Sequence, residues 1–102
     1  MSTNKQLNGI KVLELATVLA GPAVGTFLAE LGADVLKIEN PKTGGDVTRS
    51  WKLKNEAKEA PDSAYFHSVN FGKTHKFYDL TIEDDLKEVK DLAVSADIII
   101  AN

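Results

Sequence analysis

The stretch Ile10–Glu39 limits what this chain can fold into more than any other part of the sequence. A short apolar run at residues 10–15 is followed by Gly21-Pro22, and proline fits the first turn of a helix, where its missing N–H is no loss. A segment with helical apolar spacing then ends at Gly32, and a second apolar run covers residues 34–39. Because strands buried on both faces read as nearly continuous apolar runs, this order predicts two parallel strands joined by a crossover helix.

The predicted crossover helix carries apolar residues at a spacing that places them on one face. This stripe consists of Val24, Phe27, Leu28 and Leu31. An amphipathic helix gains most of its stability by burying such a face, so we expect the stripe to pack against the sheet.

Further elements are predicted in the second half of the sequence. A short helix is expected at Ala64–Asn70 and a third strand at Lys76–Leu80. Thr81 is a candidate N-cap for a longer helix, whose first turn is rich in acidic residues that the helix dipole favours. The apolar run Ile98–Ala101 is typical of a buried parallel strand. Together these patterns predict the α/β class, with Rossmann-like βαβ units and a mostly parallel sheet.

The composition excludes several classes of protein. A net charge of −3 and a pI near 5.3 give no basic surface, so neither nucleic acid nor a membrane is expected as a partner. The absence of cysteine excludes disulfides and thiolate metal sites. Residues 1–8 are polar and lack the apolar core of a signal peptide, so we expect a cytoplasmic protein.

The length of 102 residues corresponds to one small domain at most. The sequence stops at Asn102, where the last predicted strand reaches the edge at which open α/β sheets bind ligands. We therefore expect a fragment of a longer protein.

Few residues carry recognisable chemistry. No GxGxxG motif follows the first strand, so dinucleotide binding lacks its turn glycines, and we interpret Glu39 as a strand-end charge or a loop anchor. Gly44-Gly45-Asp46 has two open interpretations, a phosphate-binding set of backbone N–H groups or a flexible turn. His67 and His75 have no acidic partners at metal-ligand spacing, so no metal is predicted.

An ordered set of motifs resembles the opening of the class III CoA-transferases, a family that includes formyl-CoA transferase, the carnitine CoA-transferases and α-methylacyl-CoA racemase. The resemblance covers nearly the whole chain. Its motifs are Gly9–Leu15, Ala20–Pro22, Leu31–Glu39, Gly45–Arg49 followed by Trp51, Asn70–Lys73 and Ala96–Asn102.

The resemblance implies a fold and an activity. Residues 1–102 would form the N-terminal part of a CoA-binding large domain, a fragment of a larger interlocked-dimer fold, with a homodimer expected for the full-length protein. The substrates would be an acyl-CoA and a carboxylic acid, so coenzyme A would enter as a substrate and no tightly bound cofactor is expected. The family's catalytic aspartate, which forms an aspartyl-CoA thioester, lies beyond position 102. No catalytic residue is therefore expected here, and the segment alone is predicted to be inactive.

The resemblance also carries individual binding positions onto this sequence. The turn after the first strand contacts CoA mainly through its backbone, and many relatives have an arginine where this chain has Asn40. Trp51 matches an aromatic position near the active site. The predicted CoA-binding residues are Val18, Leu19, Ala20, Asn40, Tyr78, Asp79, Leu80, Thr81 and Asn102.

Three alternatives to a transferase remain open at this point. The first is a racemase, although the longer connection from Ser50 to Phe71, which includes Trp51, favours a transferase. A non-catalytic α/β assembly module is the second alternative, because the apolar strand Ile98–Ala101 would need a partner. Binding of NAD is the third.

Overall fold

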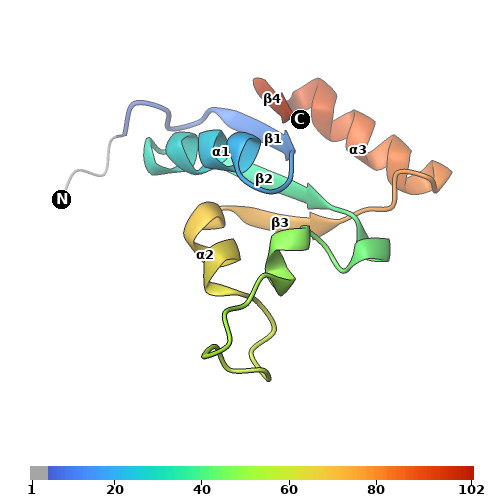
Figure 1. Ribbon diagram of the computed structural model, residues 1–102. Coiled ribbons are helices and arrows are strands. Elements are labelled where there is room, and N and C mark those ends of the chain that lie inside the picture. Colours follow the sequence, from blue (N-terminus) through green and yellow to red (C-terminus); the bar gives the residue numbers. More distant parts are fainter. Residues whose placement is uncertain (1–4) are drawn as a thin grey trace.

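The computed structural model describes residues 5–102 and contains one four-stranded sheet (Figure 1). The strands are β1 (Lys11–Leu15), β2 (Asp34–Glu39), β3 (Thr74–Phe77) and β4 (Ile98–Ala101), in the spatial order β3-β2-β1-β4. All of the pairings in this sheet are parallel, which confirms the predicted α/β class. The start of the predicted polar lead-in, residues 1–4, lies outside the described residues.

In the described part of the chain, three α-helices and two short 3₁₀ helices connect and cover the strands. They are α1 (Ala20–Glu30), η1 (Pro41–Thr43), η2 (Val47–Ser50), α2 (Ala64–Asn70) and α3 (Glu83–Ser95). The short helix α2 confirms the prediction for residues 64–70, and the Ser63 hydroxyl caps it by accepting a hydrogen bond from the Phe66 N–H at 3.0 Å. Within residues 5–102, none of these helices is long and apolar enough to cross a membrane.

Alternate residues of the central strands build a small core on each face of the sheet. On one face, Val12 and Val35 pack with Ala33 and with Leu28 of α1. On the other face, Leu13 and Ile38 pack with Val89 and Leu92 of α3. The two long helices therefore cover opposite faces, as expected for βαβ units.

The predicted stripe on α1 is wrong for two of its members, because Val24 and Phe27 are 50% and 59% exposed. The helix instead faces the sheet with Gly21, Pro22 and Gly25, which are its buried residues. A Cβ atom at Gly21 would lie 2.4 Å from the Cβ of Ala16, so only glycine permits this close approach. The helix also begins at Ala20, before the proline.

Two predicted boundaries and the predicted burial of one strand in the second half differ from the structure. Thr81 is not the N-cap of α3, because Ile82 occupies that position without a side-chain cap. The Thr81 N–H and hydroxyl both donate to the Asp79 carboxylate, and this turn ends the extended chain, so β3 covers Thr74–Phe77 instead of Lys76–Leu80. In the described chain β4 is an edge strand, and Ile99 is 51% exposed rather than buried.

Candidate functional site

The carboxyl ends of the four parallel strands meet at one edge of the sheet. One segment follows each strand at this edge. These segments are the loop Ala16–Leu19 after β1, the loop Asn40–Asp46 after β2, the segment Tyr78–Thr81 after β3, and Asn102 after β4. Open parallel sheets bind ligands at this edge. The structure therefore brings nine of the ten predicted site residues to one edge, and only Trp51 lies elsewhere.

The side chain of Asn102 contacts the backbone of Thr17. Its Nδ2 donates to the Thr17 carbonyl oxygen at 2.7 Å, and its Oδ1 accepts from the Thr17 N–H at 3.3 Å. The next residue, Val18, has a φ of 70°. Asn102 thus joins the end of β4 to the loop after β1, which contains the predicted CoA-binding residues Val18 and Leu19.

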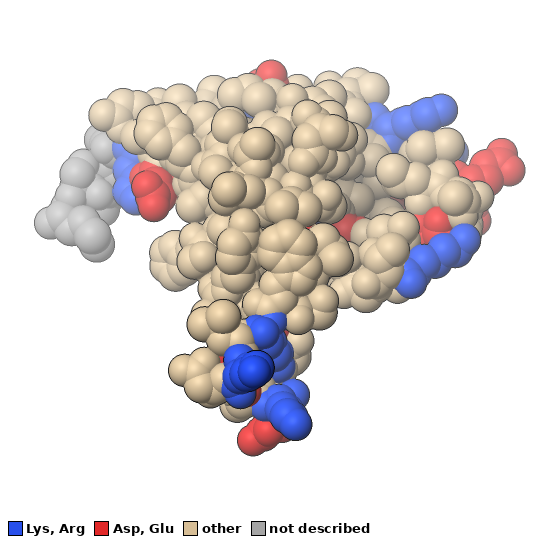
Figure 2. Space-filling view, in the orientation of Figure 1, with Lys and Arg blue, Asp and Glu red and all other residues tan. Residues whose placement is uncertain are grey.

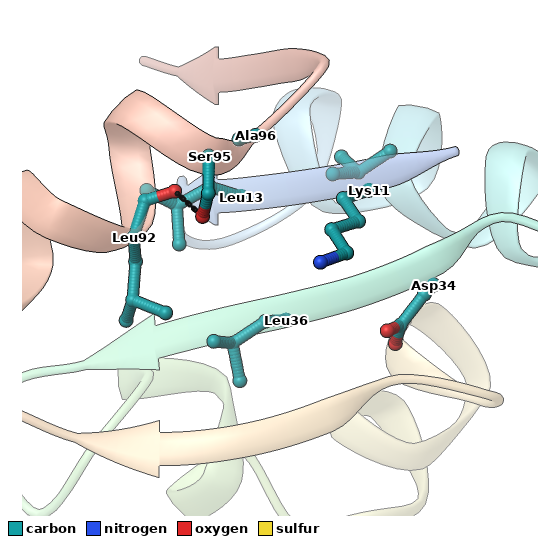
Figure 3. Close-up of a pocket in the computed structure, with 8 residues that line it drawn as sticks. Lys11, Leu13, Asp34, Leu36, Leu92, Ser95 and Ala96 are labelled. Atoms are coloured by element: carbon teal, nitrogen blue, oxygen red, sulfur yellow. Dashed lines mark hydrogen bonds between the residues drawn. The ribbon is translucent and has the colours of Figure 1, made fainter. Parts of the chain in front are cut away.

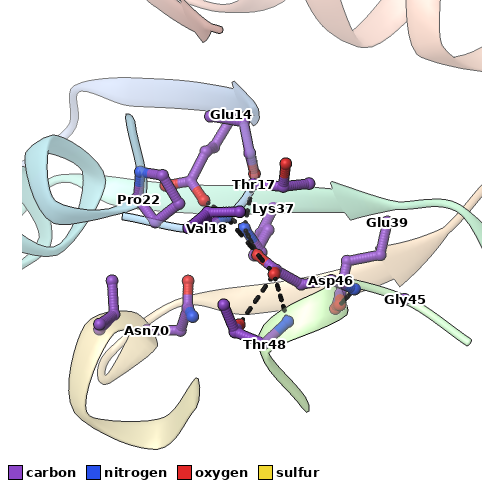
Figure 4. A network of polar contacts seen from close by, with 12 residues as sticks. Glu14, Thr17, Val18, Pro22, Lys37, Glu39, Gly45, Asp46, Thr48 and Asn70 are labelled. Carbon is purple, nitrogen blue, oxygen red and sulfur yellow. Dashed lines mark hydrogen bonds and ion pairs between the residues drawn. The ribbon is translucent and has the colours of Figure 1, made fainter. Parts of the chain in front are cut away.

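A buried lysine lies beneath this loop (Figure 4). The Nζ atom of Lys37 donates to the Ala16 carbonyl oxygen at 2.7 Å and to Oε2 of Glu14 at 2.8 Å, and it lies 3.0 Å from Oδ2 of Asp46. The three charged side chains are fully buried. A buried charge is tolerated only with such partners. Removal of one member of this cluster would leave an unpaired buried charge and destabilise the fold.

A second lysine completes the charge balance. Lys73 Nζ lies 2.8 Å from Oε1 of Glu14 and donates to the Pro22 carbonyl oxygen and to Asn70, each at 2.8 Å. Burial lowers the pKa of Lys73, and its hydrogen bond with Glu14 acts in the opposite direction. The side chain of Lys73 is fully buried, although it directly precedes the edge strand β3.

Asp46 connects the buried cluster to both neighbouring loops. Its Oδ1 accepts hydrogen bonds from the N–H and the hydroxyl of Thr48 and lies 3.5 Å from the Val18 N–H. Burial raises the pKa of the Asp46 carboxyl, but the hydrogen bonds from Thr48 and Lys37 outweigh it and lower the pKa. The carboxylate is therefore charged at neutral pH.

Glu39 anchors the loop that follows β2, which is one of the two roles predicted for it. Its buried carboxylate accepts hydrogen bonds from Arg49 Nε at 2.8 Å and from the Asp46 N–H at 2.7 Å, and it contacts His75 Nδ1 at 3.1 Å. Burial raises the pKa of Glu39, but Arg49, His75 and the Asp46 amide together hold it well below its usual range. Arg49 also lies 3.9 Å above the ring of Phe66, which fixes the guanidinium plane.

Neither interpretation of Gly44-Gly45-Asp46 agrees with the structure. The Gly44 N–H donates to the Pro41 carbonyl, the Gly45 N–H to the Asn40 carbonyl and the Asp46 N–H to Glu39. Each amide is used inside the protein, so these groups are not presented to a phosphate. The same hydrogen bonds define one loop conformation in place of a flexible turn.

The segment Tyr78–Thr81 meets the loop after β2 through Lys42. The Nζ atom of this exposed lysine lies 3.3 Å from Oδ2 of Asp79 and donates to the Thr81 hydroxyl at 3.2 Å. Asn40 itself uses its side chain to accept from the Lys42 N–H. The ring of Tyr78 packs instead with the core residues below α3, and a hydrogen bond with Glu88 raises its pKa.

Trp51 lies after η2 in the excursion between η2 and α2. Its ring packs against Tyr65, with the centroids 5.3 Å apart and the planes tilted by 54°. Together with Leu53 and Ala64, these rings line a shallow pocket of about 360 Å³. Trp51 is 45% exposed, so it does not form a closed cover over the core.

Another pocket opens at the opposite, amino-terminal end of the strands (Figure 3). Its volume is about 180 Å³, and it is lined by Lys11 and Asp34 together with apolar residues that include Leu36 and Leu92. Lys11 and Asp34 are direct neighbours in the parallel pairing of β1 and β2. None of the predicted site residues lines this pocket.

The interior ion cluster was not predicted from the sequence. Glu14 and Lys37 stand among the apolar residues of β1 and β2, and they pair in register across the two strands. Two opposite charges at buried positions of neighbouring strands are the signal that identifies such a pair. Among residues 5–102, no group of three or more His, Asp or Glu side chains is arranged to hold a metal ion.

The sequence and the fold both match one known family. The family model for CoA-transferase family III matches residues 7–102, so this chain belongs to CoA-transferase family III. It is 44% identical over 99 residues to the succinate–glutarate CoA-transferase of Agrobacterium fabrum, and the alignment covers 94% of this chain and 24% of that protein. It is 36% identical over 102 residues to the human succinyl-CoA:glutarate CoA-transferase, covering 100% of this chain and 22% of that protein.

Two further comparisons agree with the family assignment. The succinyl-CoA:mesaconate CoA-transferase of Haloarcula hispanica is 39% identical over 97 residues, which cover 94% of this chain and 24% of that protein. The crystal structure of a CAIB/BAIF family protein from Brucella suis superposes with a TM-score of 0.85 at 42% identity, covering 98% of this chain and 26% of that one. The chain thus spans about a quarter of the length of the curated relatives it matches.

Proposed function

We propose that the protein containing this segment transfers coenzyme A between an acyl-CoA and a carboxylic acid. The observation that carries the proposal is the family match over residues 7–102. The fold agrees with it, because the loops Ala16–Leu19, Asn40–Asp46 and Tyr78–Thr81 gather at one edge of the sheet. Residues 1–102 are then the N-terminal part of the CoA-binding domain. A catalytic carboxylate is expected outside the segment, so the segment by itself is predicted to be inactive.

The carboxylic acid is proposed to be a short dicarboxylate. Three relatives at 36–44% identity are named for succinate or succinyl-CoA together with glutarate or mesaconate. Succinyl-CoA with glutarate is therefore the first substrate pair to test. The relatives' names favour transfer over the racemase and assembly-module alternatives.

Coenzyme A is proposed to lie across the carboxyl edge of the sheet. The backbone of Val18, Leu19 and Ala20 leads directly into α1, whose first turn contains no acidic residue. The positive end of a helix dipole favours anionic groups, and the diphosphate of CoA is such a group. Asn40, Asp79, Leu80, Thr81 and Asn102 complete the proposed site, Tyr78 supports it from below, and Trp51 is proposed to lie near the acyl end.

The full-length protein is proposed to be a cytoplasmic homodimer. Figure 2 shows few charged side chains over α1 and α2, while lysines, arginines and acidic residues gather at the rim. On and beside these helices Val24, Phe27 and Phe71 are 50%, 59% and 77% exposed. A second copy of the chain, together with the remainder of each chain, is the proposed cover for this apolar surface.

The test is an assay of the full-length gene product with succinyl-CoA and glutarate, with separation of the CoA esters by chromatography. The proposal predicts formation of glutaryl-CoA and, in the reverse direction, of succinyl-CoA. Formation of no new CoA ester with any short dicarboxylate would contradict it. Exchange of the α-proton of a 2-methylacyl-CoA without transfer would identify the racemase branch instead.

A further inference from the structure

Val18 is the only non-glycine residue with a positive φ among residues 5–102. A β-branched side chain is strained in the left-handed region, and such strain persists only where neighbouring contacts hold the backbone. Val18 lies in the loop that is proposed to bind CoA mainly through its backbone. The contacts that hold this loop therefore bear directly on binding.

Two charged side chains reach the backbone of this loop from inside the protein (Figure 4). Lys37 donates to the carbonyl oxygen of Ala16 at 2.7 Å, and Asp46 Oδ1 lies 3.5 Å from the N–H of Val18. The two side chains are themselves paired at 3.0 Å. One ion pair thus contacts the loop on both sides of Thr17.

The ion pair is closed to solvent and to substrates. The side chains of Lys37 and Asp46 are both fully buried, and Lys37 is fixed from a third direction by Glu14 at 2.8 Å. Neither group can touch a bound CoA without displacing the loop above it. Any effect of the pair on binding must therefore pass through the loop backbone.

We propose that the buried Lys37–Asp46 ion pair is a positioning device that holds the loop Ala16–Val18 in its CoA-binding conformation. This inference rests on the proposed function. Without the pair, Val18 relaxes towards negative φ and only a fraction of the molecules present the binding-competent loop. The apparent dissociation constant then rises in inverse proportion to that fraction.

The experiment compares variants of the full-length gene product. Lys37→Met removes the donor to Ala16, and Asp46→Asn keeps the side-chain shape while it removes the charge. The matched control is Lys73→Met, because Lys73 belongs to the same buried cluster and shares Glu14 but donates to Pro22 and Asn70 instead of the loop. For each variant the measurements are kcat, KM for succinyl-CoA, KM for glutarate and the thermal midpoint.

A positioning role predicts a specific split among these quantities. KM for succinyl-CoA rises about tenfold in Lys37→Met and Asp46→Asn if the competent fraction falls to about one tenth, and KM for glutarate is unchanged. Lys73→Met lowers the thermal midpoint and leaves KM for succinyl-CoA unchanged. Glycine adopts a positive φ without strain, so Val18→Gly added to Asp46→Asn recovers part of the lost affinity.

The positioning role would be overturned if KM for succinyl-CoA rose equally in Lys73→Met, or if it did not rise in Asp46→Asn. If Lys37→Met does not fold, Asp46→Asn and its double variant with Val18→Gly still decide the question. Calorimetric titration with CoA keeps the two proposals apart. Absence of transfer by the wild-type protein contradicts the proposed function, whereas the effect of Asp46→Asn on CoA affinity supports or overturns the positioning role by itself.

Discussion

A Cβ atom at position 25 would lie 1.9 Å from Oε1 of Glu14, the same oxygen that pairs with Lys73. Gly25 faces the sheet from α1, so the absence of its side chain lets the buried carboxylate stand between the helix and the strands. The packing of α1 and the ion cluster therefore depend on each other.

Gly25→Ala is expected to destabilise the protein by about 3 kcal/mol, because the added methyl group must displace a buried, ion-paired carboxylate. Urea denaturation of the full-length gene product measures this loss. Gly44→Ala is the control, since a Cβ there meets no atom within 4 Å and only the left-handed backbone, at φ 73°, is strained. Equal losses in the two variants would contradict the close contact at Gly25.

The Glu39 carboxylate is expected to make stability depend on acid pH. Its pKa is lowered on folding, so its contribution is fully present above the ordinary value of 4.5 and is lost as the pH falls towards the lowered value. Between pH 4.5 and about pH 3.5 the loss is about 1 kcal/mol. The difference in the free energy of unfolding between wild type and Glu39→Gln should therefore shrink by this amount over the same pH range.

Ser50→Ala, an exposed and non-titrating change in η2, serves as the control for the acid experiment. Its difference from wild type should stay constant over the same pH range. A Glu39→Gln gap that also stays constant would show that the carboxylate gains no stabilisation from Arg49 and His75.

Asn102→Ala is expected to raise KM for the acyl-CoA roughly three- to tenfold, because loss of the two hydrogen bonds to Thr17 frees the loop after β1 at a cost of about 1 kcal/mol. The side chain is exposed, so the thermal midpoint should change little. Steady-state kinetics of the full-length gene product tests this. Unchanged kinetics would remove Asn102 from the proposed site.

Asp97 is expected to stabilise the pairing of β4 with β1. Its carboxylate accepts from the Lys11 N–H and its own N–H donates to the Lys11 carbonyl oxygen, each at 2.8 Å. Asp97→Ala should cost about 1 kcal/mol in the free energy of unfolding. Asp91→Ala, at an exposed position of α3, should cost clearly less, and the reverse order would contradict the role given to Asp97.

The order of strands and helices followed from the apolar pattern, because the runs at residues 10–15, 34–39 and 98–101 are apolar enough to identify parallel strands. The packing of α1 against the sheet could not be predicted from the same pattern. Hydrophobicity selects Val24 and Phe27 as the inner face, whereas the close approach to Glu14 and Ala16 requires the small side chains of Gly21 and Gly25.

The gathering of the predicted site residues at the carboxyl edge of the sheet could be predicted, since parallel strands bring their following loops together. The ion cluster beneath it could not, because Glu14, Lys37 and Lys73 come from three separate segments. Charged residues normally stand at the surface, so a strand pattern treats them as interruptions. Their burial becomes clear only when the register of β1 and β2 is known.

Hydrogen–deuterium exchange of the full-length gene product, with and without CoA, tests the central claim most directly. The claim is that CoA lies at the carboxyl edge of the sheet. It predicts slower exchange on CoA binding for the backbone amides of residues 17–20 and 79–81, with no change at Lys11 and Asp34 beside the opposite pocket. Protection at Lys11 and Asp34, with none in residues 17–20, would contradict the account.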